Sequence, residues 1–408
     1  MRRIAPVLAA ATVVALALAG CSTPAADDGG TVELTLWTGF TGGDRGAYEG
    51  LIEEFNATHD DIQVTMEVQP WDTIAQKLPS AWATGQGPDL ATPNFDPNIV
   101  AKYLETNSLL PLTDVGDTSL LAPAAIDAFT ADGELYAVPA NIATLQLYYN
   151  KALFEAAGID GPPTTVDEFR EVAQKLTGNG VYGLSLADHE TIQMWPILQW
   201  LDGADIVDAD GCSVLDSDVN IESLTTWAGL VQSGVAPVGL TGAESDALFS
   251  AGQAAMQLNG PWAAAGYTDA GIDLGVAAVP VGVDGPVTLG STVPMAIAAG
   301  TKHPAEAQEF LEWWTGQDAQ RQFALASGFP PVRTDLADDP ELAANEVVAA
   351  FAAALPSARL YLPGVTGATQ VDSEVYVPLI GEVTRGADVA TAVAAASEKL
   401  NAITGCTE

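Results

Sequence analysis

Hydrophobic and polar positions follow regular patterns from residue 32 onward. Residues 32–36 alternate apolar and polar side chains, as a half-buried strand does, and residues 48–55 carry apolar side chains at helical spacing. A second alternating stretch covers residues 62–68, and a predicted helix at 77–84 stops at the glycines that precede a short strand at 89–92. This β-α-β-α-β order predicts an α/β domain with largely parallel strands.

The same alternation of strands and helices continues to the C-terminus. A strand is expected at 145–149, and Thr165 with Glu168 forms a capping box before the next helix. Further helical patterns cover residues 224–231, 307–314, 347–355 and 389–403. No internal repeat interrupts this order, so the chain does not resemble a solenoid or a propeller.

The N-terminus carries the features of an export signal. Two arginines precede an apolar run at 4–18, which is too short to span a bilayer as a permanent helix. Leu18-Ala19-Gly20-Cys21 resembles the lipobox of bacterial lipoproteins, which implies cleavage after residue 20 and a lipid on the sulfur of Cys21. Residues 21–30 then form a small, polar tether. The alternative is an ordinary signal peptide with a chance cysteine.

Composition limits the possible partners. The chain has 408 residues, 14 Lys and Arg, 53 Asp and Glu, and a net charge of −39. Such a surface repels nucleic acid and anionic lipid headgroups, so we expect no nucleic-acid partner. The length exceeds one ordinary core, which predicts two domains, and no later segment is apolar enough for a transmembrane helix.

Cysteine and histidine positions argue for a structural disulfide and against a metal site. Cys212 and Cys406 remain if Cys21 carries lipid, and two cysteines in an exported chain are more often bridged than free. The alternative is a pair of buried thiols. His59, His189 and His303 lack metal-binding spacing. No nucleophile elbow or phosphate-binding loop is present in the sequence, so we expect no metal, no cofactor and no enzyme activity.

Several short motifs occur in an order that resembles a known family. They are Gly43-Asp44-Arg45-Gly46, Gly85-Gln86-Gly87-Pro88-Asp89, Tyr149-Asn150-Lys151, Pro163-Thr164-Thr165, Asn259-Gly260-Pro261-Trp262 and Gly328-Phe329-Pro330-Pro331. In this order the chain resembles the family 1 extracellular solute-binding proteins, the maltose-binding-like group that serves carbohydrate ABC importers. Each motif alone is weak, but together they cover nearly the whole chain.

The resemblance implies a two-lobed, periplasmic-binding-protein-like α/β fold of the class II type, with a ligand cleft between the lobes. It places crossover segments near residues 139–141 and 290–292 and a third after 331. The implied division is residues 31–139 plus 292–335 for lobe one and residues 140–291 plus 336–408 for lobe two.

A sugar site needs aromatic faces for stacking and polar side chains for hydroxyl groups. The resemblance makes Trp262 the strongest candidate, with a buried core tryptophan as the alternative. Asp44 and Arg45 match an acidic and basic pair of the family, or are a solvated charge pair. The other candidates are Phe40, Thr41, Asn94, Asp96, Asn141 and Asn259. Trp71 and Trp195 are secondary candidates that could equally cover the edge of a core.

The chain departs from the maltose-binding member at three places. Pro93 stands where that protein carries a stacking tryptophan, Ala143 replaces an acidic residue, and Ser373 lies near the position of another tryptophan. These differences argue against maltose itself, and a carbohydrate remains the expected class of ligand.

We therefore expect a monomeric, lipid-anchored binding subunit on the outer face of the cell membrane, which delivers a mono- or oligosaccharide to ABC permease subunits. Three alternatives remain open. The solute could be a polyol, phosphodiester or polyamine. Two facing carboxylates could make the chain a surface glycosidase. The chain could also serve a sensor kinase instead of an importer.

Overall fold

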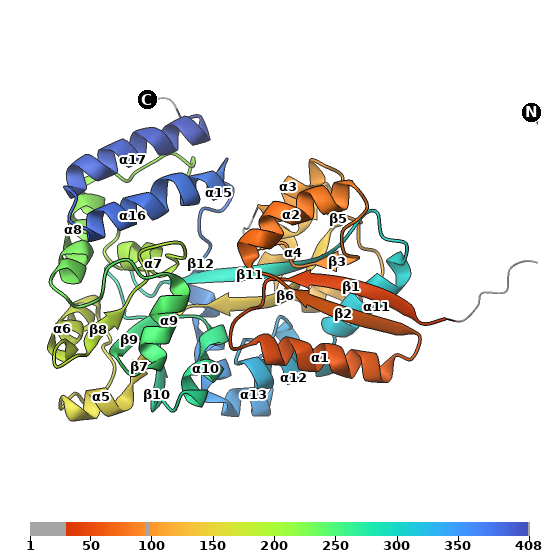
Figure 1. Cartoon of the computed structure of the whole chain (residues 1–408), viewed down its shortest axis with the longest axis horizontal. Coiled ribbons are helices and arrows are strands. Elements are labelled where there is room, and N and C mark those ends of the chain that lie inside the picture. The colour runs from red at the N-terminus through yellow and green to blue at the C-terminus, as the bar shows by residue number, and fades with distance from the viewer. Residues whose placement is uncertain (1–29, 95–97, 407–408) are drawn as a thin grey trace, which may run out of the picture.

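A computed structural model describes residues 30–94 and 98–406 of the chain (Figure 1). The elements form two lobes that lie side by side, and two long strands run between them. The predicted signal peptide, the predicted lipid site at Cys21 and the candidate Asp96 fall outside the described residues.

Lobe one is built on the first three strands. β1 and β2 pair in parallel, with Leu36 opposite Met66, and β3 pairs with β1 in parallel on its other side. The elements of this lobe are β1 (Val32–Thr38), α1 (Arg45–Thr58), β2 (Ile62–Val68), α2 (Trp71–Ala83), β3 (Leu90–Ala91), α3 (Ile99–Leu104), η1 (Thr118–Leu120), α4 (Pro123–Ala128), β4 (Thr130–Ala131), β5 (Glu134–Leu135), α11 (Pro304–Trp314) and α12 (Gln317–Ser327). The predicted β-α-β-α-β opening is therefore confirmed.

Lobe two contains a mixed four-stranded sheet in the order β10-β7-β9-β8. Its elements are β7 (Gln146–Asn150), α5 (Lys151–Ala156), α6 (Val166–Leu176), β8 (Tyr182–Ser185), α7 (Met194–Leu201), α8 (Asp218–Gln232), α9 (Gly242–Ser250), β9 (Ala254–Asn259), η2 (Pro261–Ala263), α10 (Ala264–Asp269), β10 (Leu274–Ala277), α15 (Ala368–Val371), η5 (Asp372–Tyr376), α16 (Val377–Thr384) and α17 (Val389–Thr404). The parallel pairing predicted for the opening strands does not extend to this sheet, because β7 pairs antiparallel with both β9 and β10.

Two antiparallel strands, β6 (Ala137–Thr144) and β11 (Thr288–Ile297), connect the lobes (Figure 1). The crossovers expected near 139–141 and 290–292 fall on these strands. The register shifts between Val293 and Pro294, where Pro139 lies opposite Pro294. Proline has no backbone N–H, so the hydrogen-bond ladder is interrupted where the strands pass between the lobes.

The remaining connection leaves α12 and returns to lobe two. It runs through η3 (Thr334–Leu336) and α13 (Pro340–Ala344) to α14 (Glu346–Ala354), η4 (Leu355–Ser357) and β12 (Ala358–Arg359). Thr144 and Gln146 donate side-chain hydrogen bonds to the carbonyls of Phe351 and Ala350. This connection is therefore fixed to the lobe-two end of β6.

Local sequence signals explain several boundaries. Thr165 and Glu168 form the predicted capping box at the start of α6, and α17 ends at Gly405, whose φ is 81°. The predicted disulfide between Cys212 and Cys406 is present, with Cα atoms 5.6 Å apart, and joins residues separated by 194 positions. It ties the C-terminal end of α17 to the loop before α8.

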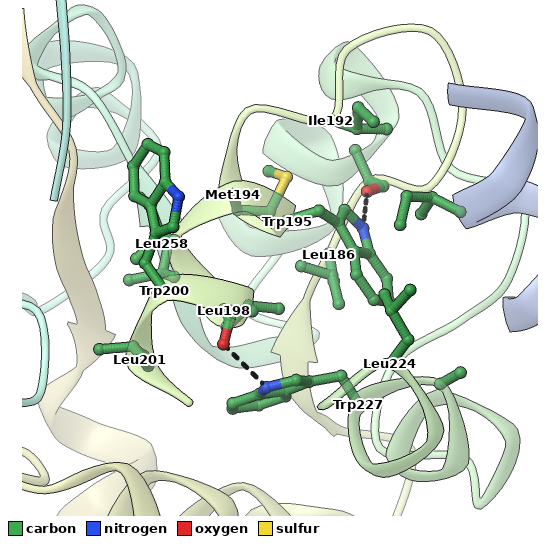
Figure 2. Packing of buried hydrophobic residues seen from close by; sticks show 14 of the residues in the cluster. Leu186, Ile192, Met194, Trp195, Leu198, Trp200, Leu201, Leu224, Trp227 and Leu258 are labelled. Carbon is green, nitrogen blue, oxygen red and sulfur yellow. Dashed lines mark hydrogen bonds between the residues drawn. The ribbon is translucent and has the colours of Figure 1, made fainter. Parts of the chain in front are cut away.

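Each lobe has its own hydrophobic core. Leu34, Leu36 and Phe55 belong to the core of lobe one, and Trp195, Trp227 and Leu198 belong to that of lobe two. Figure 2 shows the lobe-two core, in which the indole N–H of Trp195 donates to the Ala187 carbonyl and that of Trp227 to the Leu198 carbonyl. The core positions predicted for Trp227 and Trp314 are confirmed, since both are fully buried.

Candidate functional site

The turn that carries Trp262 lies where the two lobes meet. Trp262 is half-buried and packs against the cores of both lobes, and its ring centroid lies 6.3 Å from that of Phe329. Gly260 makes this ring position possible, because a β-carbon there would lie 2.1 Å from the indole. The strongest sequence candidate therefore sits between the lobes and is not enclosed in either core.

The loop after β1 approaches this turn from lobe one. A β-carbon on Gly43 would lie 3.1 Å from the Trp262 carbonyl oxygen and 3.1 Å from the Gly266 nitrogen. One on Gly42 would lie 3.7 Å from the Trp262 β-carbon. The backbone of the loop after β1 therefore lies against the backbone around Trp262 in the other lobe. Only glycine fits at residue 43 without a shift of these backbone atoms.

Asp44 begins α1 beside this contact. Asp44 is only 5% exposed, and its side chain does not cap the helix. Burial raises the pKa of Asp44 to about 7, and a hydrogen bond with its own backbone lowers it in part. Asp44 therefore lies at the lobe junction as a carboxyl group whose charged form is poorly stabilised.

Arg45 does not join Asp44 at the lobe junction. Its guanidinium pairs with Glu49 at 2.7 Å, one helical turn along α1, and its side chain is 52% exposed. Arg45 therefore does not pair with Asp44, because helical geometry turns consecutive residues to different faces, and its contact with a ligand stays a prediction. Thr41 is exposed on the same loop.

An aromatic stack supports this loop from within lobe one. The ring of Phe40 stacks on that of Tyr48 with centroids 3.7 Å apart, and Tyr48 stacks on Trp314 at 5.7 Å. Phe40 is 5% exposed and meets the half-buried Trp71 edge to face at 5.5 Å. Phe40 thus supports Trp71 from behind, and Trp71 is the more exposed ring of this pair.

Asn141 belongs to the crossover strand and contacts the same stack. It is buried, and its amide donates to the Tyr48 hydroxyl at 2.5 Å. This bond ties β6 to α1. Asn141 therefore holds a supporting position in this structure, and its contact with a ligand stays a prediction.

Asn259, like Asn141, forms hydrogen bonds within the protein. Its amide donates to Asp246 at 2.7 Å, and its carbonyl oxygen accepts the Gly260 N–H at 2.8 Å. Gln257 and Tyr267 also donate to Asp246, at 2.9 Å and 3.1 Å. Burial raises the pKa of Asp246, while these donors lower it in part. The network fixes the turn before Trp262, so Asn259 positions that residue.

Trp195 is wrong as a candidate for ligand contact. It is fully buried in the lobe-two core, as Figure 2 shows, and its N–H is already bonded to Ala187. Every residue of α7 is buried, so this helix has no open face. Asn94 is half-buried just after β3.

Sequence reasoning missed several residues of the site. Gly42 and Tyr48 were absent from the candidates, as were Asp246, Tyr267 and Phe329. The paired glycines after β1 were an available signal for close approach. Asp246 gave no such signal, because its contact with Asn259 depends on the tertiary structure and not on a local sequence pattern.

Other possible sites lie elsewhere. A cavity of about 390 Å³ is lined by Trp200, Asp205, Asp284 and Arg359, with Arg359 paired to Asp205. Within the residues described, no three His, Cys, Asp or Glu side chains are grouped to hold a metal ion. None of the helices in 30–94 and 98–406 is long and apolar enough to cross a membrane.

Known proteins share this architecture. A maltotriose-binding protein of Pyrococcus abyssi is 29% identical over 350 residues, which cover 81% of this chain and 73% of the relative. A galactooligosaccharide-binding protein of Bacillus subtilis is 25% identical over 359 residues, covering 83% and 82%. The GacH receptor of Streptomyces glaucescens, solved unliganded and with acarbose, matches with a TM-score of 0.83 at 25% identity, covering 93% of this chain and all of that one.

The family assignment follows from the extent of the match. Residues 50–350 match the family described as bacterial extracellular solute-binding protein, which is well over half of the chain. The two-lobed fold agrees with this match over nearly the whole described length. The chain belongs to the family of bacterial extracellular solute-binding proteins.

Proposed function

We propose that the chain is the binding subunit of an ABC importer and captures a mono- or oligosaccharide between its lobes. The observation that carries this proposal is the position of Trp262, which packs against both cores beside Asp44. A sugar offers C–H faces that stack on aromatic rings and hydroxyl groups that bond to polar side chains. Trp262 and Trp71 would supply the rings, and the Asp44 carboxylate would accept hydrogen bonds from sugar hydroxyl groups.

Capture depends on movement of the lobes. A sugar that contacts both lobes favours the closed form, because only that form offers both sets of contacts. The paired prolines of β6 and β11 are a suitable hinge, since the ladder is already interrupted there. We propose residues 31–139 plus 292–335 and residues 140–291 plus 336–408 as the two moving units.

The relatives support the choice of solute. The names of the Pyrococcus abyssi and Bacillus subtilis proteins specify maltotriose and galactooligosaccharides, and the GacH structure holds acarbose. We extend this class, and not any one sugar, to the present chain. Permease subunits in the membrane would be its partners, and the protein itself would act as a monomer.

We also propose that the protein is held at the outer face of the membrane by a lipid on Cys21. The motif Leu18-Ala19-Gly20-Cys21 supports this proposal. Replacing Cys21 with Ala should release the protein from membranes into the medium, measured by fractionation of expressing cells. Retention of the variant in the membrane fraction would contradict lipid anchoring.

The sugar proposal is tested by thermal unfolding of the purified protein with mono- and oligosaccharides, polyols and polyamines. A ligand that binds only the folded state raises the unfolding midpoint as its concentration rises. A rise with one sugar class supports the proposal. A rise only with polyamines or polyols would contradict it, and steady cleavage of a reporter glycoside would indicate an enzyme.

A further inference from the structure

The Asp44 carboxyl lies against the contact between the lobes. A β-carbon on Gly42 would lie 2.8 Å from the Asp44 Oδ1 and 3.7 Å from the Trp262 β-carbon, so carboxyl, loop and opposite lobe converge. Asp44 is 5% exposed. The carboxyl therefore has little contact with water beside the contact between the lobes.

The surrounding residues provide little to balance its charge. The side chain does not cap α1, and the hydrogen bond that stabilises its charged form comes from its own backbone. The adjacent Arg45 is turned outward to Glu49. The other arginines and the lysine that form ion pairs in the described residues are paired with carboxylates other than Asp44; they are Arg170, Arg321, Arg333, Arg359 and Lys399.

A buried carboxylate without a partner is costly, and a hydrogen-bond donor removes most of that cost. A solute can supply the donor as a hydroxyl group, or more strongly as a protonated amine. Above pH 7, where Asp44 is ionised, a solute carboxylate or phosphate would instead add a second negative charge at low dielectric constant. The surroundings of Asp44 thus favour some charge classes of solute over others.

We propose that Asp44 sets the charge class of the solute: the site accepts neutral or amine-bearing sugars and excludes anionic ones. This inference rests on the proposed function and narrows it. Phosphodiesters and uronic acids are removed from the candidate solutes, whereas amino sugars are added. Asp44 acts here as a specificity-determining residue.

The test compares three groups of probes by thermal unfolding and titration calorimetry. They are neutral malto- and cello-oligosaccharides, glucosamine oligosaccharides and galacturonate oligosaccharides. The proteins are the wild type, Asp44→Asn, which keeps the shape of the side chain, and Glu49→Gln, which removes an exposed carboxylate from the same helix. Salt concentration is held constant, because exposed charges are screened, and the pH is held above the pKa of Asp44, so that its carboxyl group is ionised.

The wild type should bind a neutral or glucosamine probe and leave galacturonates unbound. Asp44→Asn should reduce the ratio of affinities for the neutral or glucosamine probe and for galacturonate about tenfold or more. Glu49→Gln should change this ratio little. Tight galacturonate binding by the wild type, or an unchanged preference in Asp44→Asn, overturns the inference. If no sugar of any charge binds, the proposed function fails first and the inference falls with it.

Discussion

Gly43 of lobe one lies so close to Trp262 of lobe two that a β-carbon on Gly43 would come within 3.1 Å of the Trp262 carbonyl oxygen. The neighbouring Gly266 nitrogen would lie equally near. Both contacts are with backbone atoms, which cannot rotate away as a side chain could. The close approach therefore links one glycine to the ability of the lobes to close.

Replacing Gly43 with Ala should oppose closure without altering either core. Overpacking costs about 1–3 kcal/mol, so sugar affinity should fall by roughly tenfold while the unfolding midpoint of the free protein changes little. Gly46→Ala is the matched control, because a β-carbon at Gly46 meets nothing within 4 Å. Equal sugar affinity in both variants, measured by calorimetry, would contradict the role of this contact.

Two tryptophans should respond differently to truncation. Trp195→Ala empties a fully buried position and should cost about 3–5 kcal/mol of unfolding free energy. Trp262→Ala removes a half-buried ring between the lobes and should abolish sugar binding with a smaller loss of stability. Denaturant titrations and calorimetry on both variants separate these effects. A stable Trp195→Ala protein that has lost only sugar binding would reverse the two assignments.

The network behind Trp262 makes a third prediction. Asn259→Ala leaves the Gly260 N–H without its acceptor and removes one of the three donors to the Asp246 carboxyl, which should cost about 1–3 kcal/mol. Sugar affinity should fall as well, because the turn that places Trp262 loses its support. Asn94→Ala provides a comparison at a half-buried site. If Asn259→Ala keeps full stability and loses only sugar contacts, then Asn259 touches the ligand directly.

Asp44 should make stability depend on pH. Its pKa is raised by burial to about 7 in the folded protein, above the ordinary value of 3.8. Between these values the folded state holds a proton that the unfolded state has lost, so the stability contributed by this group falls as pH rises from 3.8 to about 7. The midpoint advantage of Asp44→Asn should therefore grow over this range and level off above it. A constant difference in thermal scans from pH 4 to 8.5 would show that Asp44 is not buried in solution.

The disulfide should stabilise lobe two without affecting the site. Replacing both Cys212 and Cys406 with Ser should lower the unfolding free energy by about 2–5 kcal/mol. Sugar affinity should stay the same, because the bridge ties the end of α17 to the loop before α8. Chemical denaturation under oxidising conditions measures the first effect. An equal loss in a reduced wild-type sample would confirm that the bridge, and not the serines, is responsible.

Periodicity predicted the elements of this fold well where one face of an element is buried. The opening strands, the capping box at Thr165 and the C-terminal helix all follow from local pattern. The direction of the strands in lobe two does not follow from local pattern, because β7 pairs with β9 and β10, which come more than a hundred residues later in the chain. Such pairings depend on topology and leave no mark on local alternation.

The candidate site could be predicted only in part. Trp262 stood out because Asn259-Gly260-Pro261-Trp262 matches a motif of the family. Trp195 was a secondary candidate with a core position as its alternative, and the apolar residues on every side of α7 indicate that core position. Glu49, one turn after Arg45, was likewise a visible sign of an outward ion pair. The partners of Asn259 lie on α9 and α10 and became apparent only from the structure.

The central claim is that a sugar binds between the lobes in contact with Trp262. The most direct measurement is titration calorimetry of the wild type and Trp262→Ala in parallel, with maltotriose, galactooligosaccharides and arabinooligosaccharides as ligands. We predict saturable binding of at least one sugar by the wild type and none by a Trp262→Ala protein that unfolds cooperatively. Unchanged binding by that variant, or no sugar binding by the wild type, would contradict the claim.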